Sequence, residues 1–385
     1  MSAESLTPLE LANRKLDNCS PAILPSELKS NFDLVKRNLA ELVTEEELAK
    51  VMEKPCRRAY IGFEPSGFVH LGWKLCANKI IDLVNAGFEM QILLADWHAM
   101  INDKLGGDLS KIQACGKYME DCFYALGVPR EKIKFVYAND FVSDPKYWET
   151  VINVAKNTSL ARMKRAMDIM GRSADELEKD VSKFIYPAMQ VADIFYMNID
   201  LAYGGMDQRH AHMLCRDIAP KLVRIPPVAI HTPLLSGLKG AGRMDPVKME
   251  NGVAVFGGNQ AKMSKSDPDS AVFIHDSAED IRRKIQKAFC PEKIVEGNPI
   301  TDICRFIVFA ERQVLEIKRP EKYGGNLTIN GYDELAHAFS EGQLHPMDLK
   351  AAVAEALVEI LEPVRKYFEM HPENLEKMRK MIVTR

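Results

Sequence analysis

The sequence predicts a doubly wound parallel α/β sheet followed by a separate C-terminal α-helical domain. Before Asp269, short apolar runs of strand length alternate with stretches whose apolar residues recur at helical spacing. One of these runs, Met90 to Ala95, is apolar on both sides, as a strand inside a parallel sheet requires. After Asp269 only helical stretches follow, and a chain of 385 residues is too long for one comfortable core. We therefore expect two domains.

The elements of the α/β part are predicted in chain order. Residues 1–30 are expected to form an extension, because Pro21 and Pro25 interrupt any long helix. Residues 31–54 carry apolar side chains at helical spacing and predict one or two amphipathic helices. The next segments are a strand at Arg58–Phe63, a turn at Glu64–Gly67, a helix at Leu71–Ala86 closed by Gly87, and strands at Met90–Ala95, Lys132–Tyr137 and Pro227–His231.

Five helices are predicted after Asp269. Pro363 should bend the fourth helix near its end, and Asp348 should cap the same helix at its N-terminus. The five are Ala278–Phe289, Asp302–Glu311, Tyr332–Glu341, Met347–Phe368 and Pro372–Met381.

Composition narrows the class of protein. An apolar share of 46% and a charged share of 27% exclude wholesale disorder and fibrous structure. Because 51 basic residues face 54 acidic ones, for a net charge of −3, any nucleic-acid partner must bind to local basic patches. The sequence shows neither an apolar run of bilayer length nor a signal-peptide pattern, so we expect a cytoplasmic protein without a membrane partner. The eight cysteines form no CxxC pair and are expected to be reduced.

A buried helix at residues 186–196 bears an unusual polar stripe. Pro187 suits the first helical position with Tyr186 as the cap, and the remaining residues are apolar almost all round. Gln190 and Asp193 share one side with Tyr186, and a buried carboxylate is costly unless it is matched. Two matches are possible: an internal partner, such as an arginine or a tyrosine hydroxyl of a neighbouring strand, or a small ligand with polar ends.

Two further motifs suggest phosphate binding. His70-Leu-Gly72 stands at a helix N-terminus directly after the first strand, where backbone N–H groups and a glycine allow the close approach of a phosphate or an adenine ring. The loop Lys262-Met263-Ser264-Lys265-Ser266 places two lysines where they can close over a polyphosphate. Alone, each motif is weak, because a histidine at a turn is usually solvated and a glycine-flanked loop is usually a flexible connection. His210, His212 and Cys215 lack a fourth ligand, so no metal site is expected.

Both motifs in this order on one α/β chain resemble the signatures of class I aminoacyl-tRNA synthetases. Five further residues resemble those of tyrosyl-tRNA synthetases of the archaeal and eukaryotic cytosolic type, namely Tyr60, Tyr186, Gln190, Asp193 and Gln208. The resemblance runs from about Asn31 to Phe368. It implies a Rossmann-like catalytic domain at 31–269 with a helical connective insertion around 103–185, and a helical anticodon-binding domain at 270–385.

The resemblance also implies a tyrosine site. Tyr60 and Asp193 would hold the phenolic hydroxyl of L-tyrosine, whereas Tyr186, Gln190 and Gln208 would hold its amino end. Such a pocket would reject phenylalanine, because its polar groups would be left unpaired.

The implied reaction has two steps. The tyrosine carboxylate attacks the α-phosphate of ATP, which arrives with Mg²⁺, and the resulting tyrosyl-adenylate passes tyrosine to the 3′ end of tRNA(Tyr). Catalysis would come from positioning and from donors to the developing charge. The catalytic donors would be His70, Lys262 and Lys265, and the ATP site would also include Gly72, Met263, Ser264 and Ser266. Trp73 stands where many class I enzymes have histidine, and its indole can offer only one donor.

Recognition of tRNA(Tyr) is assigned to two regions. Residues 156–172 carry Arg162, Lys164 and Arg165 on an expected helix, which the family resemblance makes an acceptor-stem contact and part of a homodimer interface. From charge alone, a solvated basic helix face explains this segment nearly as well. Tyr323, His345 and Asp348 match the anticodon-reading residues, where an aromatic ring stacks on a base and a carboxylate bonds its edge.

Three rival functions stay open at the level of sequence. A tryptophanyl-tRNA synthetase shares the fold and both signatures, although Tyr60 with Asp193 favours a phenol over an indole. A non-catalytic RNA-binding or signalling protein could keep the fold, although it would have no need for the intact Lys262–Ser266 loop. A small adenylyltransferase would have no use for the long helical domain.

Overall fold

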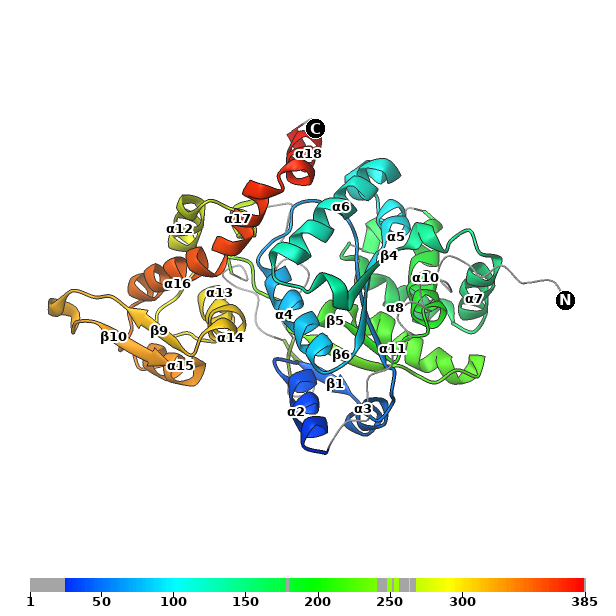
Figure 1. The fold of residues 1–385 in the computed structure, drawn as a ribbon, viewed down its shortest axis with the longest axis horizontal. Helices are drawn as coiled ribbons and strands as arrows, with labels where there is room; N and C mark the ends of the chain where they lie inside the picture. The colour runs from blue at the N-terminus through cyan, green and yellow to red at the C-terminus, as the bar shows by residue number, and fades with distance from the viewer. Residues whose placement is uncertain are drawn as a thin grey trace.

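The computed structural model describes residues 25–172, 174–177, 180–240, 248–250, 253–255, 263 and 268–383. A six-stranded sheet with helices on both faces forms the larger part of the molecule (Figure 1). The strand order is β1-β6-β5-β2-β3-β4, and β2 to β6 are parallel, whereas β1 pairs antiparallel with β6. The strands are β1 Glu41–Val43, β2 Arg58–Phe63, β3 Glu89–Leu94, β4 Ile133–Tyr137, β5 Leu201–Gly205 and β6 Val228–Thr232.

The strand order changes direction at β2, which is the switch point of the sheet. The chain runs from β2 outward through β3 and β4, and then returns to the other side of β2 to form β5 and β6. In such sheets a crevice opens at the carboxyl ends of the two strands flanking this switch point. Here these strands are β2 and β5, in which Tyr60 pairs with Ala202. The predicted doubly wound sheet is confirmed.

The two faces of the sheet carry different helices. Ala59 and Ile61 of β2 pack into a core with α4 (Gly72–Asn85) and α6 (Leu109–Ala125). Tyr60 points to the opposite face, as strand alternation requires, and joins a core with α7 (Pro145–Lys156), α10 (Ser182–Tyr196) and α11 (Arg209–Ile218). The other helices of this part are α2 Pro25–Lys36, α3 Glu45–Met52, α5 Asp96–Ile101, α8 Leu160–Ala166 and α9 Ala174–Leu177.

The C-terminal part is helical but also contains a two-stranded antiparallel ribbon, β9 (Val314–Ile317) with β10 (Leu327–Asn330), that the helical expectation missed. Its last helices lie along α6 (Figure 1). Tyr367 and Asn374 donate to the carboxylate of Asp121 at 3.1 and 2.7 Å. The helices are α12 Ala278–Lys287, α13 Pro299–Ile303, α14 Phe309–Glu311, α15 Tyr332–Ser340, α16 Pro346–Ile360, α17 Glu362–Met370 and α18 Glu373–Val383.

Several boundaries differ from the sequence-based expectation for identifiable reasons. Pro187 lies inside α10, which begins five residues earlier at Ser182, where Asp180 accepts from the Ser182 backbone at 3.0 Å. Pro363 does not bend one long helix, because α16 ends at Ile360 and the proline occupies the first turn of the new helix α17. Asp348 is not the cap of α16, since Pro346 starts that helix and His345 caps it.

The connection from residue 156 to residue 172 is not the expected single helix. Lys156 ends α7, and α8 starts anew at Leu160 with Ser159 as its cap.

The expectation that all cysteines are reduced is wrong for Cys56, which forms a disulfide. No helix in the described part of the chain has the length and apolar character that a bilayer span requires.

Candidate active site

The predicted tyrosine-site residues converge at the switch point of the sheet. Tyr60 comes from β2, and Tyr186, Gln190 and Asp193 come from α10, which packs over that face. Gln208 ends the short 3₁₀ helix at Met206–Gln208 that follows β5. The structure therefore brings together side chains from three segments that are far apart in the sequence.

Asp193 anchors one end of this cluster and is completely buried. Its Oδ1 accepts a hydrogen bond from the Tyr147 hydroxyl at 2.8 Å. Its Oδ2 lies 3.2 Å from Nε2 of His98 without hydrogen-bonding alignment, and accepts no hydrogen bond from any described residue. One oxygen of Asp193 therefore has an internal partner, a tyrosine on helix α7 and not on a strand as expected. The other oxygen is left for another donor.

Charge and burial keep the phenols around Asp193 protonated. Burial, reinforced by the Asp193 carboxylate, raises the pKa of Tyr60 and of Tyr147 far above the usual range. For His98, burial alone would lower the pKa, but the nearby Asp193 carboxylate outweighs burial and raises it. The acid consequently sits among groups that can all donate hydrogen bonds.

The other end of the cluster is built from acceptors. The Tyr186 hydroxyl donates to Oε1 of Glu64 at 2.9 Å, and Nε2 of Gln190 donates to Oε1 of Gln208 at 3.2 Å. Gln208 in turn donates to the Ile169 carbonyl at 3.4 Å. Oε1 of Gln190 is buried and has no hydrogen-bond partner within the described ranges. This end therefore suits a cationic donor such as an ammonium group.

Gly72 is the first residue of helix α4, and His70 lies two residues before it. Nδ1 of His70 accepts from the Gly72 backbone N–H at 3.2 Å, so the neutral ring carries its proton on Nε2, the atom that could donate to a phosphate. A Cβ added at Gly72 would lie only 2.9 Å from Cε1 of His70. Gly72 is therefore needed for the packing of His70, in addition to any close approach of a ligand.

Of the lysine loop, only Met263 belongs to the described residues. It is buried and its backbone N–H donates to the Leu235 carbonyl at 3.2 Å. The predictions for Lys262, Ser264, Lys265 and Ser266 lie outside the described residues. Trp73 is buried and stacks at 4.3 Å from the ring of Phe63, which is a packing role.

The candidate metal ligands do not converge on one point. Nδ1 of His212 lies 3.0 Å from Nε2 of His231, whereas His210 is 3.7 Å from Asp168. Among the described residues, no three histidine, cysteine or acidic side chains are placed to share an ion.

The residues predicted to contact tRNA belong to two separate regions of the chain. Arg162 on α8 pairs with Asp217 at 2.8 Å, and Lys164 and Arg165 are exposed on the same helix. In the C-terminal part, Nδ1 of the exposed His345 accepts from the Met347 backbone at 3.2 Å, and Asp348 lies in the same turn. Tyr323 ends a 3₁₀ turn at Glu321–Tyr323 between β9 and β10.

Sequence reasoning missed Glu64, His98 and Tyr147. Glu64 directly follows β2, and His98 lies in α5, which follows β3. The rule that ligands bind beyond the carboxyl ends of parallel strands could have singled out these two. Tyr147 gives no comparable signal, because it reaches Asp193 only through the packing of α7 on α10.

Comparisons with known proteins show the family of the chain. Residues 52–362 match the family described as tRNA synthetases class I (W and Y). The chain is 51% identical over 341 residues to the tyrosine–tRNA ligase of Aeropyrum pernix, covering 88% of this chain and 93% of that one. The tyrosyl-tRNA synthetase of Pyrococcus horikoshii, crystallised with L-tyrosine, superposes with a TM-score of 0.83 at 42% identity, covering 92% and 99%.

The tryptophan enzyme is a more distant relative. The tryptophanyl-tRNA synthetase of Aeropyrum pernix superposes with a TM-score of 0.62 at 18% identity, covering 86% of this chain and 84% of that one, which shows a shared fold alone. The chain therefore belongs to the class I aminoacyl-tRNA synthetases, in the tyrosyl-tRNA synthetase family.

Proposed function

We propose that the side chains gathered between β2 and α10 form a pocket for L-tyrosine and that the chain is a tyrosine–tRNA ligase. Enzymes of this family use ATP, an amino acid and tRNA as substrates. One observation supports the assignment of the pocket above all others. Oδ2 of Asp193 and Oε1 of Gln190 are buried and accept no hydrogen bond from a described residue, although Nε2 of His98 lies 3.2 Å from Oδ2. A buried acceptor without a partner costs free energy, and L-tyrosine carries a donor at each of its two ends.

The phenol end would be selected by Tyr60 and Asp193. The phenolic O–H of the substrate donates to Oδ2 of Asp193, while the Tyr147 hydroxyl already occupies Oδ1. A phenylalanine ring would fill the same space and leave Oδ2 unpaired, which disfavours its binding. The ammonium end would be held by the hydroxyl oxygen of Tyr186 and the side-chain oxygens of Gln190 and Gln208.

Activation would follow from placing the tyrosine carboxylate against ATP. The carboxylate oxygen forms a bond to the α-phosphorus, the bond to the bridging oxygen breaks, and pyrophosphate leaves. His70 donates to the developing phosphate charge through Nε2, and Lys262 and Lys265 supply positive charge from the loop. Gly72, Met263, Ser264 and Ser266 complete the nucleotide site. Mg²⁺ enters bound to ATP as part of the substrate and neutralises phosphate charge.

Transfer would follow when a ribose hydroxyl at the 3′ end of tRNA(Tyr) attacks the adenylate carbonyl and AMP leaves. Lys164 and Arg165, together with Arg162 on the same helix, would contact the acceptor stem. Tyr323, His345 and Asp348 would read the anticodon from the C-terminal part. This reaction belongs in the cytoplasm, where translation takes place.

A second copy of the chain would complete the functional unit as a homodimer. The outer side of α7 bears a groove of 690 Å³ lined by Val142, Trp148 and Ile152, and Ile152 is 57% exposed. Leu160 at the start of α8 is 64% exposed. Large apolar side chains left exposed on neighbouring helices favour an interface. Sedimentation should show a dimer for the wild type, and Ile152→Asp should shift it to a monomer; a wild-type monomer at micromolar concentration would refute the homodimer.

The amino acid that drives ATP–pyrophosphate exchange tests the proposed function directly. Tyrosine should stimulate exchange, whereas tryptophan and phenylalanine should not. Stimulation by tryptophan instead would establish the tryptophan enzyme. Tight binding of RNA without formation of any adenylate would establish a non-catalytic RNA-binding protein.

A further inference from the structure

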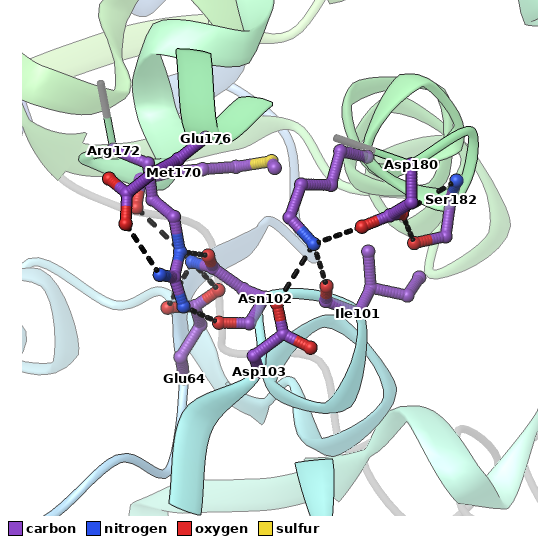
Figure 2. Close-up of polar contacts among 10 residues, drawn as sticks. Glu64, Ile101, Asn102, Asp103, Met170, Arg172, Glu176, Asp180 and Ser182 are labelled. Carbon is purple, nitrogen blue, oxygen red and sulfur yellow. Dashed lines mark hydrogen bonds and ion pairs between the residues drawn. The ribbon is translucent and has the colours of Figure 1, made fainter. Parts of the chain in front are cut away.

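The end of helix α5 carries a fully buried asparagine that lies directly behind the ammonium end of the pocket. Asn102 is 0% exposed. Its Nδ2 donates to both oxygens of Glu64, at 2.9 and 3.1 Å, and to the Met170 carbonyl at 3.1 Å (Figure 2). The side-chain amide thus joins the loop after β2 to the segment that precedes α9.

Arg172 fixes the orientation of this amide. Nε of Arg172 donates to Oδ1 of Asn102 at 2.6 Å, and a second guanidinium nitrogen donates to the Asn102 carbonyl. Since a guanidinium has only donors, the amide oxygen must face Arg172, and the NH₂ group must then face Glu64. Figure 2 shows Arg172 between Asn102 and Glu176, whose carboxylate lies 3.4 Å away.

The orientation of Asn102 determines what Tyr186 can offer to a ligand. Glu64 accepts from Asn102 and also from the Tyr186 hydroxyl at 2.9 Å. Because the Tyr186 hydroxyl donates its proton to Glu64, the lone pairs of the hydroxyl oxygen stay available to accept from an ammonium group. If Glu64 turned away, the Tyr186 hydroxyl could rotate and point its proton toward the ammonium group, so its lone pairs would no longer be held toward the ligand.

We propose that Asn102, locked by Arg172, is a positioning residue for the ammonium-binding end of the tyrosine pocket. It acts through Glu64 and Tyr186 and does not itself touch the substrate. The proposal rests on the proposed function, because it takes L-tyrosine as the ligand of this pocket.

Lys183, which contacts the same end of α5, provides a matched control. It is 2% exposed, and its Nζ donates to the Ile101 carbonyl at 3.2 Å, to Asp103 at 2.9 Å and to Asp180 at 2.7 Å (Figure 2). Lys183 therefore fastens the same end of α5 to α10, but none of these three contacts involves Glu64. A substitution of Lys183 loosens the helix end without disturbing Glu64 directly.

The experiment compares two ligands that differ only in the amino group. Dissociation constants for L-tyrosine and for 3-(4-hydroxyphenyl)propanoate are measured calorimetrically on the full chain and on Asn102→Asp, Asn102→Ala, Arg172→Ala and Lys183→Met. Asn102→Asp keeps the contact with Arg172 but places a carboxylate against Glu64.

Both Asn102 variants should weaken L-tyrosine binding about tenfold and change the binding of the des-amino analogue less than twofold, as loss of one hydrogen bond to a charged group suggests. Arg172→Ala, at a partly exposed position, should give a smaller loss, about threefold, with the same selectivity for L-tyrosine. Lys183→Met should show no such selectivity.

Equal weakening of both ligands in the Asn102 variants, or the same selective loss in Lys183→Met, would make Asn102 a structural brace and overturn the proposal. If the Asn102 variants do not fold, an absence of selective loss in Arg172→Ala overturns it as well. Failure of the proposed function is a separate result, in which the wild-type chain itself does not bind L-tyrosine.

Discussion

A half-satisfied carboxylate is the most informative single group in this molecule. Asp193 is buried with one oxygen bonded to Tyr147 and the other accepting from no described residue. The arrangement is stable without ligand because one hydrogen bond and the nearby His98 offset much of the cost of burying the charge. On the proposed function, the phenolic hydroxyl of L-tyrosine would complete the bonding of this oxygen.

Loss of the carboxylate should therefore relax selection for a hydroxyl group. In Asp193→Ala, the ratio of kcat/KM for tyrosine over phenylalanine in pyrophosphate exchange should fall at least about tenfold, with KM for ATP nearly unchanged. Tyr147→Phe, which keeps the acid and removes its internal donor, should lower this ratio less. Equal losses for tyrosine and ATP would show that Asp193 braces the whole domain.

At the scale of elements, buried caps fix where the helices of the C-terminal part begin. Asn298, which is fully buried, starts α13 by accepting from the Ile300 backbone at 3.0 Å, and its amide donates to the Ile294 carbonyl at 2.9 Å. His345 starts α16 at an exposed position, where its Nδ1 accepts from the Met347 backbone at 3.2 Å and its Nε2 lies 3.6 Å from Glu292. Both caps accept from a backbone N–H of the first turn, but Asn298 is buried and His345 is exposed.

This difference predicts unequal stability costs. Asn298→Ala should lower the free energy of unfolding by about 2–3 kcal/mol, because it leaves buried backbone groups unpaired. His345→Ala should cost about 0.5–1 kcal/mol, since water replaces the lost partner. Chemical denaturation of both variants measures the difference. If His345 also reads the anticodon, its variant alone should lose affinity for tRNA(Tyr). Similar stability costs for the two variants would contradict the assigned role of burial.

At the scale of the whole molecule, an aromatic cluster holds the C-terminal helices against the α/β part. His275 lies among Phe68, Tyr118 and Phe368, with ring centroids 5.0, 6.2 and 6.3 Å away. Burial lowers the pKa of His275 to about 4, helped by the positive charges of Arg379 and Lys284. Burial likewise lowers the pKa of His212 to about 3. Both rings are neutral in the folded chain.

Acid should consequently weaken the fold. The unfolded chain protonates these histidines near pH 6.5, whereas the folded chain resists protonation down to about pH 4 at His275. Between these pH values the unfolded state binds more protons, so the free energy of unfolding falls as the pH falls. His275 alone should account for a loss of about 2 kcal/mol between pH 7 and pH 5.

Urea unfolding at the two pH values tests this dependence. His275→Gln should lose less stability than the wild type on going from pH 7 to pH 5. His337→Gln, at an exposed position, serves as the control and should keep the wild-type dependence. If His275→Gln showed the full wild-type loss, the acid sensitivity would have to come from other groups.

Particular elements show which parts of the fold can be predicted from the sequence. The strand at Arg58–Phe63 was predicted with the bounds of β2, and the helix closed by Gly87 corresponds to α4, because both have strong local patterns and Gly87 takes a positive φ of 84°. β1 and β5 were missed: β1 is three residues long, and β5 reads Leu-Ala-Tyr-Gly-Gly, which has little β-branched character. The start of α10 was misplaced because Pro187 is a strong helix-start signal that tertiary packing overrode.

The sequence by itself determined the doubly wound sheet, the family signatures and the polar stripe of Gln190 and Asp193, since periodicity and residue type are local properties of the chain. Only the tertiary structure decided which partners those groups have. Tyr147 and His98 approach Asp193, and Glu64 approaches Tyr186 with Asn102 behind it, from three different segments. Hydrogen bonds between distant segments depend on how helices pack against the sheet, and no local pattern of residues encodes that geometry.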